Sequence, residues 1–314
     1  MKNQESLSRA IKARALELGF TDCGIARVRS MNDERAYLDL YIDEGRNAGM
    51  TYLAERRDLR TQPGLLLPGA RSVIVALLNY FPAEEVPSSD VKISTYAYGR
   101  DYHEIIREKL NQLCLFLDES FPGHQHKASV DSAPVFEKAW AREAGLGWIG
   151  KNCLLVNEHG SYHFIGSILT QAELEPDAPA AEQCGECMLC LEACPTGALT
   201  AACRLDARLC ISYLTISHKG NYQEGTPGDF KDYIFGCDLC QQACPLNHRA
   251  RASTEKDFLP GHDILTLQSD DWLKMDEETF RRITASSAMK KTGLENMQRN
   301  VRHCRTKQDL TEKS

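Results

Sequence analysis

Seven of the thirteen cysteines in this 314-residue chain stand in two closely spaced motifs, which constrain the fold more than any other feature. The first motif, CGECMLCLEACP at residues 184–195, has the spacing C-x₂-C-x₂-C-x₃-C-P. Two-residue spacers let consecutive thiolates bind one face of an iron–sulfur cubane, and the cysteine before proline binds the other cluster in two-cluster ferredoxins. A Cys₄ zinc site also uses C-x₂-C pairs, but it requires neither the third cysteine at this spacing nor the Cys-Pro pair. The motif therefore predicts [4Fe–4S] clusters.

The second motif, CDLCQQACP at residues 237–245, lacks its first ligand, because Ile234 stands where a cysteine is needed. Either Cys203 or Cys210 could supply the missing thiolate from upstream. We prefer Cys210, because it belongs to a predicted short helix that runs back toward the sheet, whereas Cys203 lies in the turn that follows Cys194. The crossed pattern of two-cluster ferredoxins then predicts two ligand sets. Cluster one takes Cys184, Cys187, Cys190 and Cys244, and cluster two takes Cys194, Cys210, Cys237 and Cys240.

The remaining composition indicates a reducing compartment and offers one basic segment. The N-terminal residues contain scattered Arg and Glu and lack the continuous apolar segment of an export signal. We therefore expect a cytoplasmic protein whose cysteines stay reduced. No apolar run of about 18 residues occurs, which predicts no membrane span. The net charge of −7 disfavours nonspecific nucleic-acid binding, but residues 281–307 hold eight Lys or Arg against one Glu. This basic segment is a candidate for contact with a nucleic-acid backbone, and a solvated helix face is the alternative.

Residues 1–172 alternate helix-like and strand-like segments, which predicts an α/β (α+β) fold. Residues 72–80 form an apolar run typical of a strand covered on both faces, and residues 126–132 and 162–170 are further strand candidates. Asp101 and Glu104 predict a capping box at the start of a helix over residues 101–120, and Pro134 predicts the start of another. We expect four parts. They are an α/β domain at 1–172, an acidic linker at 173–183, a ferredoxin-like domain with two [4Fe–4S] clusters at 184–250 and a helical segment at 251–314.

The glycine-rich stretch GLGWIGKN at residues 145–152 matches G-x-G-x-x-G and nearly matches a P-loop. The stretch follows a predicted helix, whereas a dinucleotide-binding motif follows a strand, and Asn152 stands where a P-loop needs a hydroxyl. Both features argue against nucleotide binding. We expect a turn in which Gly145 ends the preceding helix in the left-handed conformation.

Two segments and the cysteine pattern together resemble a known family. The segments YAYGRDYHEIIREKL (96–110) and VDSAPVFEKAWAREAGLGWIGKNCLLVN (130–157) are similar to those of epoxyqueuosine reductases, which complete queuosine biosynthesis on tRNA. The resemblance runs from about residue 5 to residue 302. It implies a cobalamin-binding N-terminal domain, similar to that of reductive dehalogenases, and two [4Fe–4S] clusters. Many members continue into a C-terminal helical-repeat domain, and because this chain ends before it, we expect a short form.

The resemblance implies that the chain reduces epoxyqueuosine to queuosine at the tRNA wobble position, using cob(I)alamin that receives electrons from the two clusters. It places the family's proton donor at Asp131, between a predicted strand and the next helix. The alternative is that Asp131 only caps that helix. A carboxylic acid that donates a proton at neutral pH needs a raised pKa, which an apolar cavity would provide and the helix dipole would oppose.

The same resemblance implies cofactor contacts and partners. No D-x-H-x-x-G motif, which supplies an axial histidine in other cobalamin proteins, occurs in the chain, so we expect base-off cobalamin. The candidate cobalamin contacts are Arg60, Tyr96, His103, Lys151, Asn152 and Ser212. The expected partners are tRNA carrying epoxyqueuosine in its anticodon loop and an external electron donor of flavodoxin or ferredoxin type. We expect the protein to be a monomer. Two other interpretations are a dehalogenase-like cobalamin enzyme and a non-enzymatic electron-transfer or cobalamin-handling protein.

Overall fold

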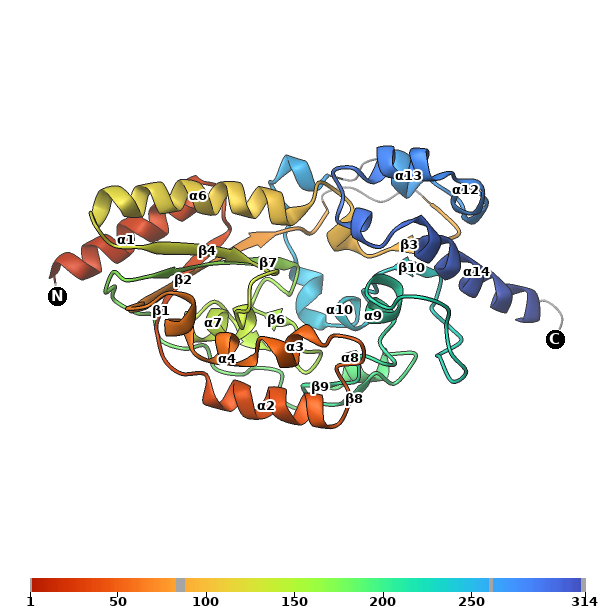
Figure 1. Cartoon of the computed structure of the whole chain (residues 1–314), viewed down its shortest axis with the longest axis horizontal. Coiled ribbons are helices and arrows are strands. Elements are labelled where there is room, and N and C mark those ends of the chain that lie inside the picture. The colour runs from red at the N-terminus through yellow and green to blue at the C-terminus, as the bar shows by residue number, and fades with distance from the viewer. Residues whose placement is uncertain (1, 83–87, 260–261, 312–314) are drawn as a thin grey trace.

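The computed structural model of the protein describes residues 2–82, 88–259 and 262–311. A four-stranded sheet with its helices forms the N-terminal part, and a mainly helical part holds the C-terminus, so that α1 and α14 lie at opposite ends of the molecule (Figure 1). This mixture of helices and strands confirms the predicted fold class. The longer helices are α1 (Lys2–Glu17), α2 (Asn32–Asp43), α6 (Tyr102–Ser120), α7 (Glu137–Glu143), α13 (Glu277–Thr284) and α14 (Leu294–Thr311).

The main sheet has the order β1-β2-β7-β4, and each neighbouring pair is antiparallel. Its strands are β1 (Asp22–Arg27), β2 (Ser72–Asn79), β7 (His163–Thr170) and β4 (His126–Val130). All eight residues of the central strand β2 are buried, as predicted for a strand covered on both faces. Because β2 and β4 run opposite to β7, the ends of β2 and β4 meet the start of β7 at one edge of the sheet. That edge positions the site described below.

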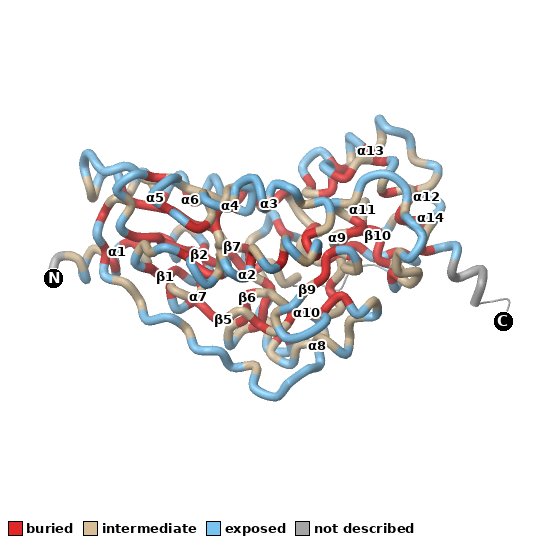
Figure 2. Tube along the Cα trace, turned by 60° about the horizontal axis from the view of Figure 1, so that its bottom comes forward, coloured by how far each residue is buried: buried red, intermediate tan, exposed pale blue. Residues whose placement is uncertain are grey.

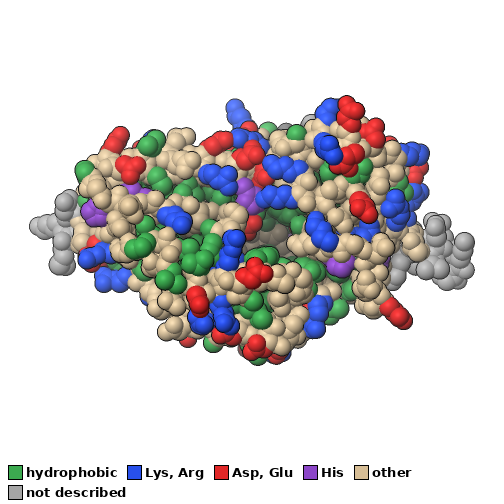
Figure 3. Space-filling view, viewed as in Figure 1, with side chains coloured by type: hydrophobic (Ala, Val, Ile, Leu, Met, Phe, Trp, Pro, Cys, Tyr) green, Lys and Arg blue, Asp and Glu red, His purple; other side chains and the backbone are tan. Residues whose placement is uncertain are grey.

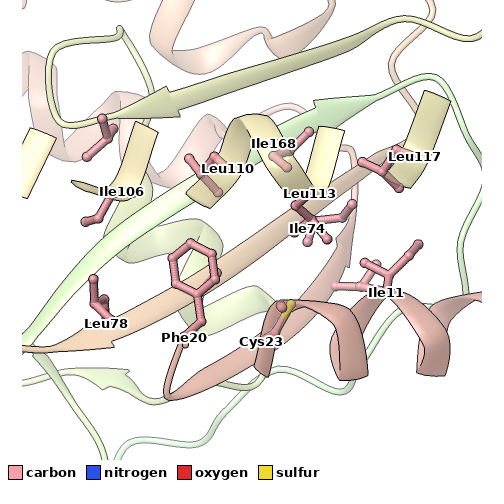
Figure 4. Close-up of a cluster of buried hydrophobic side chains, with 14 of the residues drawn as sticks. Ile11, Phe20, Cys23, Ile74, Leu78, Ile106, Leu110, Leu113, Leu117 and Ile168 are labelled. Carbon is pink, nitrogen blue, oxygen red and sulfur yellow. The ribbon is translucent and has the colours of Figure 1, made fainter. Parts of the chain in front are cut away.

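Helices cover both faces of this sheet. On one face, α1 and α6 pack through an apolar cluster that includes Ile11, Ile74 and Leu113, as Figure 4 shows. One stripe of α6 is buried against this face, namely Ile105, Leu110, Leu113 and Leu117. On the other face, α7 packs against β1, β2 and β7, and Trp140 is fully buried there.

The cysteine-rich segment consists of short elements joined by turns. They are α8 (Leu189–Glu192), β8 (Leu199–Ala201), β9 (Arg204–Leu205), α9 (Ile211–Ile216), β10 (Tyr233–Phe235) and α10 (Leu239–Gln242). Strand β10 pairs in parallel with β3 (Lys92–Ile93), a strand that belongs to the N-terminal part of the sequence. Residues 91–97 are therefore built into the core around β10, together with the C-terminal helices α12 (Ser269–Lys274) and α14. Figure 2 shows buried residues concentrated in the main sheet and in this second core.

Two local predictions at helix starts need correction. Asp101 caps α6 as predicted, since its side chain accepts a hydrogen bond from the amide of His103, but its own amide donates to the carbonyl of Ser286, so Glu104 does not complete a capping box. Pro134 does not open the next helix, because α7 begins only at Glu137. Gly145 ends α7 with a φ of 77°, as predicted. Within the described residues, no helix has both the length and the apolar character needed to cross a membrane.

Candidate active site

Two cavities open at the sheet edge where β2 and β4 end and β7 begins. The first cavity, of about 580 Å³, reaches Asp131 after β4, and the second, of about 470 Å³, reaches Tyr80 after β2 and His163 at the start of β7. The face shown in Figure 3 is hollowed near its middle, between the part with the main sheet and the part with α14. The first cavity has an aromatic and apolar wall that includes Tyr37, Tyr52 and Trp148.

Four cysteines from three segments line the second cavity. Cys194 follows α8, Cys210 lies directly before α9, and Cys237 and Cys240 lie at the start of α10. Burial raises the pKa of Cys237 to about 12, and the nearby thiols of Cys210 and Cys194 add to the rise. These are the four residues predicted to hold cluster two. Their mutual repulsion as thiolates is what a cationic iron–sulfur core would relieve, so this donor set fits such a cluster.

A second group of cysteines gathers around Cys190. Burial raises the pKa of this thiol, and Cys184, Cys187 and Cys244 contribute to the rise by their proximity. They are the other three residues predicted for cluster one. The indole nitrogen of Trp148 donates a hydrogen bond to the sulfur of Cys184 at 3.3 Å. Cys187 is exposed, whereas the four cysteines around the second cavity are half-buried, so this group lies nearer the protein surface.

Cys203, the less favoured candidate for the fourth ligand of cluster two, is not among the described residues that line the second cavity. It lies in the turn between β8 and β9 with a φ of 55°, lines the first cavity, and its thiol donates to the carbonyl of Gly150 at 3.4 Å. The structure therefore brings Cys210, and not Cys203, together with the cysteines of the second motif.

Asp131 stands at the tip of the loop that joins β4 to α7. Its backbone has a φ of 49°, a left-handed conformation that is uncommon outside glycine and costs free energy of about 1–3 kcal/mol at functional sites. Oε1 of Glu137 accepts a hydrogen bond from the amide of Asp131 at 2.6 Å, and Nε2 of His103 lies 3.1 Å from its Oδ2. The residue before α7 is Phe136, and no side chain caps this helix. The alternative that Asp131 serves only as a helix cap is therefore wrong.

The electrostatics of Asp131 differ from those that a lone proton donor requires. The hydrogen bond from His103 lowers the pKa of Asp131 and outweighs the opposing effect of burial. Burial alone would lower the pKa of His103, but its hydrogen bonds to Asp101 and Asp131 outweigh it and raise this pKa to about 9. Burial, reinforced by the charge of Asp131, raises the pKa of Glu137 to about 8. At neutral pH, protonated His103, protonated Glu137 and ionised Asp131 are thus favoured.

The candidate cobalamin contacts are divided between the two cavities. Arg60 lines the first cavity, its guanidinium stacks over Tyr52 at 5.8 Å, and its buried Nε has no hydrogen-bond partner among the described residues. Three candidates line the second cavity, namely Tyr96, Asn152 and Ser212. The structure brings these four to the cavities.

The other two candidates, His103 and Lys151, are not among the described residues that line either cavity. His103 joins Asp101 to Asp131, and Lys151 donates to the carbonyl of Gly185 at 2.6 Å and faces neither cavity. Lys151 therefore supports the loop that carries the first cysteine motif.

Residue patterns missed two members of the site. Glu137 lies in the first turn of a helix, where an acidic residue is common, so nothing in the pattern sets it apart. Trp148 lies in the glycine-rich stretch, and only the fold brings its indole to Cys184.

Much of the positive charge in the predicted basic segment is already paired. Arg281 pairs with Glu277 at 3.1 Å, and Arg305 pairs with Asp270 at 2.5 Å. Arg299 donates to the carbonyls of residues 214, 218 and 220 and stacks over Tyr222, so it holds the fold of this part together. Contact between this segment and a nucleic-acid backbone stays a prediction. Fewer unpaired positive charges are available for it than the eight Lys and Arg residues of the segment suggest.

Comparisons with known proteins identify the family. Residues 60–132 match the family described as epoxyqueuosine reductase QueG, DUF1730, and residues 183–247 match a 4Fe-4S double cluster binding domain. The second match confirms the iron–sulfur interpretation of the cysteine motifs over the zinc alternative.

Curated relatives match nearly the whole chain. An epoxyqueuosine reductase of Cellulophaga algicola is 40% identical over 302 residues, covering 96% of this chain and 99% of the relative. An epoxyqueuosine reductase of Escherichia coli is 36% identical, covering 94% of this chain and 79% of the relative. A solved epoxyqueuosine reductase with an epoxyqueuosine-modified tRNA-Tyr stem loop has a TM-score of 0.89 at 29% identity, covering 95% of this chain and 80% of that one. The protein belongs to the epoxyqueuosine reductase family.

Proposed function

We propose that this protein reduces the epoxide of epoxyqueuosine in tRNA to give queuosine. The single observation that carries the proposal is the meeting of a carboxylate and a set of thiols at one edge of the sheet. Asp131 lines the first cavity, and four cysteines line the second. Tyr102 lines the second cavity and lies against Asp131, whose pKa it helps to lower, so the two cavities adjoin. A proton donor and an electron source are thus available to one substrate.

Two [4Fe–4S] clusters would be held by the crossed cysteine sets and would supply electrons at low potential. Cys184, Cys187, Cys190 and Cys244 would hold cluster one, and Cys194, Cys210, Cys237 and Cys240 would hold cluster two. The exposure of Cys187 supports electron entry at cluster one, from a donor of flavodoxin or ferredoxin type. The position of Cys210 and Cys240 at the wall of the second cavity supports electron exit there.

Cobalamin is the cofactor that the family implies, and the residues of the two cavities fit it. The first cavity offers the aromatic wall that a large apolar macrocycle needs, and the unpartnered Nε of Arg60 offers a donor for an acceptor group at its edge. When bound, cobalamin supplies a strongly nucleophilic metal for attack on an epoxide carbon. Tyr96, Asn152 and Ser212 would contact it from the second cavity.

The protein's own contribution is to orient the substrate and to move a proton. Asp131 would protonate the oxygen that leaves the epoxide carbon. Its position in a loop is supported by an epoxyqueuosine reductase from Bacillus subtilis, similar to this chain with a TM-score of 0.87 at 28% identity, in which a catalytic loop that carries an aspartate is swung out of the active site. A wobble base must leave its stack to enter such a cavity, and the half-exposed rings of Tyr37 and Tyr52 offer aromatic faces at the cavity wall.

The test is anaerobic turnover. Protein with reconstituted clusters, cobalamin and a low-potential reductant is incubated with tRNA carrying epoxyqueuosine, and the nucleosides are quantified by mass spectrometry. We expect queuosine to form with the native protein. An Asp131→Asn variant should lose at least about 100-fold in rate, as is typical for removal of a general acid. Normal cluster and cobalamin content in this variant shows that the loss is chemical, and an active variant would refute the role of Asp131.

A further inference from the structure

His103 lies between two carboxylates that both face its ring nitrogens. Nδ1 is 2.6 Å from Oδ1 of Asp101, and Nε2 is 3.1 Å from Oδ2 of Asp131. An ionised carboxylate can only accept hydrogen bonds, and a neutral imidazole carries one N–H donor. With both carboxylates ionised, the geometry is satisfied only when both ring nitrogens carry protons. One proton more than a neutral imidazole holds is therefore stored in this row of three side chains.

The two ends of the row are not equivalent. Asp101 is buried, with only 3% of its side chain exposed, whereas the side chain of Asp131 is 61% exposed, because it faces the open first cavity. Asp101 also accepts from the amide of His103 and lies 3.5 Å from the ammonium of Lys290. The contact on Nδ1 is thus anchored, while the contact on Nε2 is with a residue that meets the substrate.

The other charged and titratable groups around His103 and Asp131 come from five elements. Tyr102 neighbours it on α6, Glu137 approaches from α7 beside Asp131, and Lys290 and Lys291 approach from the turn before α14. Tyr52 and Arg60 face Asp131 from α3 (Tyr52–Glu55) and α4 (Arg57–Thr61). Burial and the charge of Lys291 disfavour a positive charge on His103, and the two contacting carboxylates overcome these effects.

We propose that the proton delivered to the epoxide oxygen is stored on His103 and passes to the substrate through Asp131. The inference rests on the function proposed above. As the C–O bond breaks, its electron pair stays on the oxygen, and the replacing electrons come from the reduced cofactor. The Nε2 proton of His103 passes to Oδ2 of Asp131, and the carboxylic acid formed in this way gives a proton to the oxygen. The net result is one new O–H bond, an unchanged Asp131 and a neutral His103 that still donates from Nδ1 to Asp101.

This arrangement explains why Asp131 can act as a donor although its pKa is lowered. A carboxylate that is ionised at rest cannot hold the proton by itself, but an imidazolium at 3.1 Å can supply it at the moment when a strong base forms. Loss of the epoxide oxygen as water consumes two protons; this store supplies one of them, and His103 must take up a proton again before Asp131 can deliver the second.

The experiment measures single-turnover rates from pH 5 to pH 10 in protein loaded with clusters and cobalamin. The native enzyme should hold a plateau that ends near pH 9, where His103 deprotonates. In His103→Gln the side-chain amide can still donate to Asp131 but cannot release a proton, so the plateau should end near pH 5 and the rate at pH 8 should fall by about 100-fold or more. His124→Gln, an exposed histidine before β4, is the matched control and should keep the native profile.

Each other outcome has a defined meaning. A His103→Gln profile that keeps its plateau, or that falls equally at every pH, would overturn the proposal and leave His103 a structural residue. If His103→Gln does not bind its cofactors, Asp101→Asn replaces it, because loss of the anchoring charge should move the end of the plateau to lower pH by about one unit or more. An unmoved profile in Asp101→Asn would also overturn the proposal.

A readout without turnover separates this inference from the proposed function. In oxidised, cluster-loaded protein with ¹⁵N-labelled histidine, the His103 signals, assigned by their absence in His103→Gln, should report two protonated nitrogens at pH 7. A neutral imidazole at pH 7 would exclude the store. Native protein that leaves epoxyqueuosine unreduced while showing a protonated His103 would refute the proposed function alone.

Discussion

Replacing Cys210 by alanine tests how the second cysteine motif obtains its fourth ligand. Cys210 lines the same cavity as Cys194, Cys237 and Cys240, from a position directly before α9. Alanine is preferred to serine for the test, because a serine oxygen can replace a thiolate as a ligand. The change removes one buried sulfur and keeps the backbone of the helix start.

The magnitude follows from the division of the cysteines into two groups. Two [4Fe–4S] clusters hold about eight irons per chain, and the group around the second cavity accounts for one cluster. Loss of cluster two should therefore reduce the iron content from about eight to about four per chain. Cluster one should remain, because its four proposed ligands lie around Cys190.

The matched control is Cys203→Ala. Cys203 is the other cysteine between the two motifs, and its thiol donates to the carbonyl of Gly150 at the wall of the first cavity. This variant should keep both clusters. The assay is iron and acid-labile sulfide content after anaerobic reconstitution, with EPR spectra of the reduced protein to count the clusters. Full iron in Cys210→Ala, or half the iron in Cys203→Ala, would refute the ligand assignment.

Three further predictions test other parts of the structure. Trp148→Phe removes the hydrogen bond to the sulfur of Cys184 and should lower the potential of cluster one in an EPR redox titration, because such bonds stabilise the reduced cluster; an unchanged potential would contradict this assignment. Gly24→Ala places a Cβ against the carbonyl of residue 144 and should lower the free energy of unfolding, measured by heat or denaturant, by about 1–3 kcal/mol. In the control Gly64→Ala the new Cβ meets open space, so the free energy of unfolding should change by less than about 0.5 kcal/mol. Because the folded protein raises the pKa of His103 from 6.5 to about 9, its contribution to stability should be complete below pH 6.5 and lost as the pH rises through 9. Native protein and His103→Gln should therefore converge in unfolding free energy above pH 9, and a constant difference would contradict the shift.

Local patterns were sufficient for the secondary structure and for the type of metal centre. The apolar run at residues 72–80 corresponds to the buried strand β2, and the helix predicted over residues 101–120 corresponds to α6. Both were predictable because burial of a strand on both faces, or of a helix along one stripe, produces a short-range pattern of apolar residues. The start of α7 was misplaced, because the loop that holds Asp131 takes up the residues after Pro134. The antiparallel pairing of the sheet could not be read from residues that are equally apolar on both faces.

The amino-acid order by itself determined that the chain carries closely spaced thiols for iron–sulfur clusters, since ligand spacing within a turn is a local property. Tertiary structure alone decided which distant side chains meet. The hydrogen bond from Trp148 to Cys184 and the contact of His103 with Asp131 join segments that no periodicity connects. The pKa values of His103, Asp131 and Glu137 likewise depend on burial and on charges brought in from other elements. Electrostatic interactions act through space over a few ångströms, and only folding sets those distances.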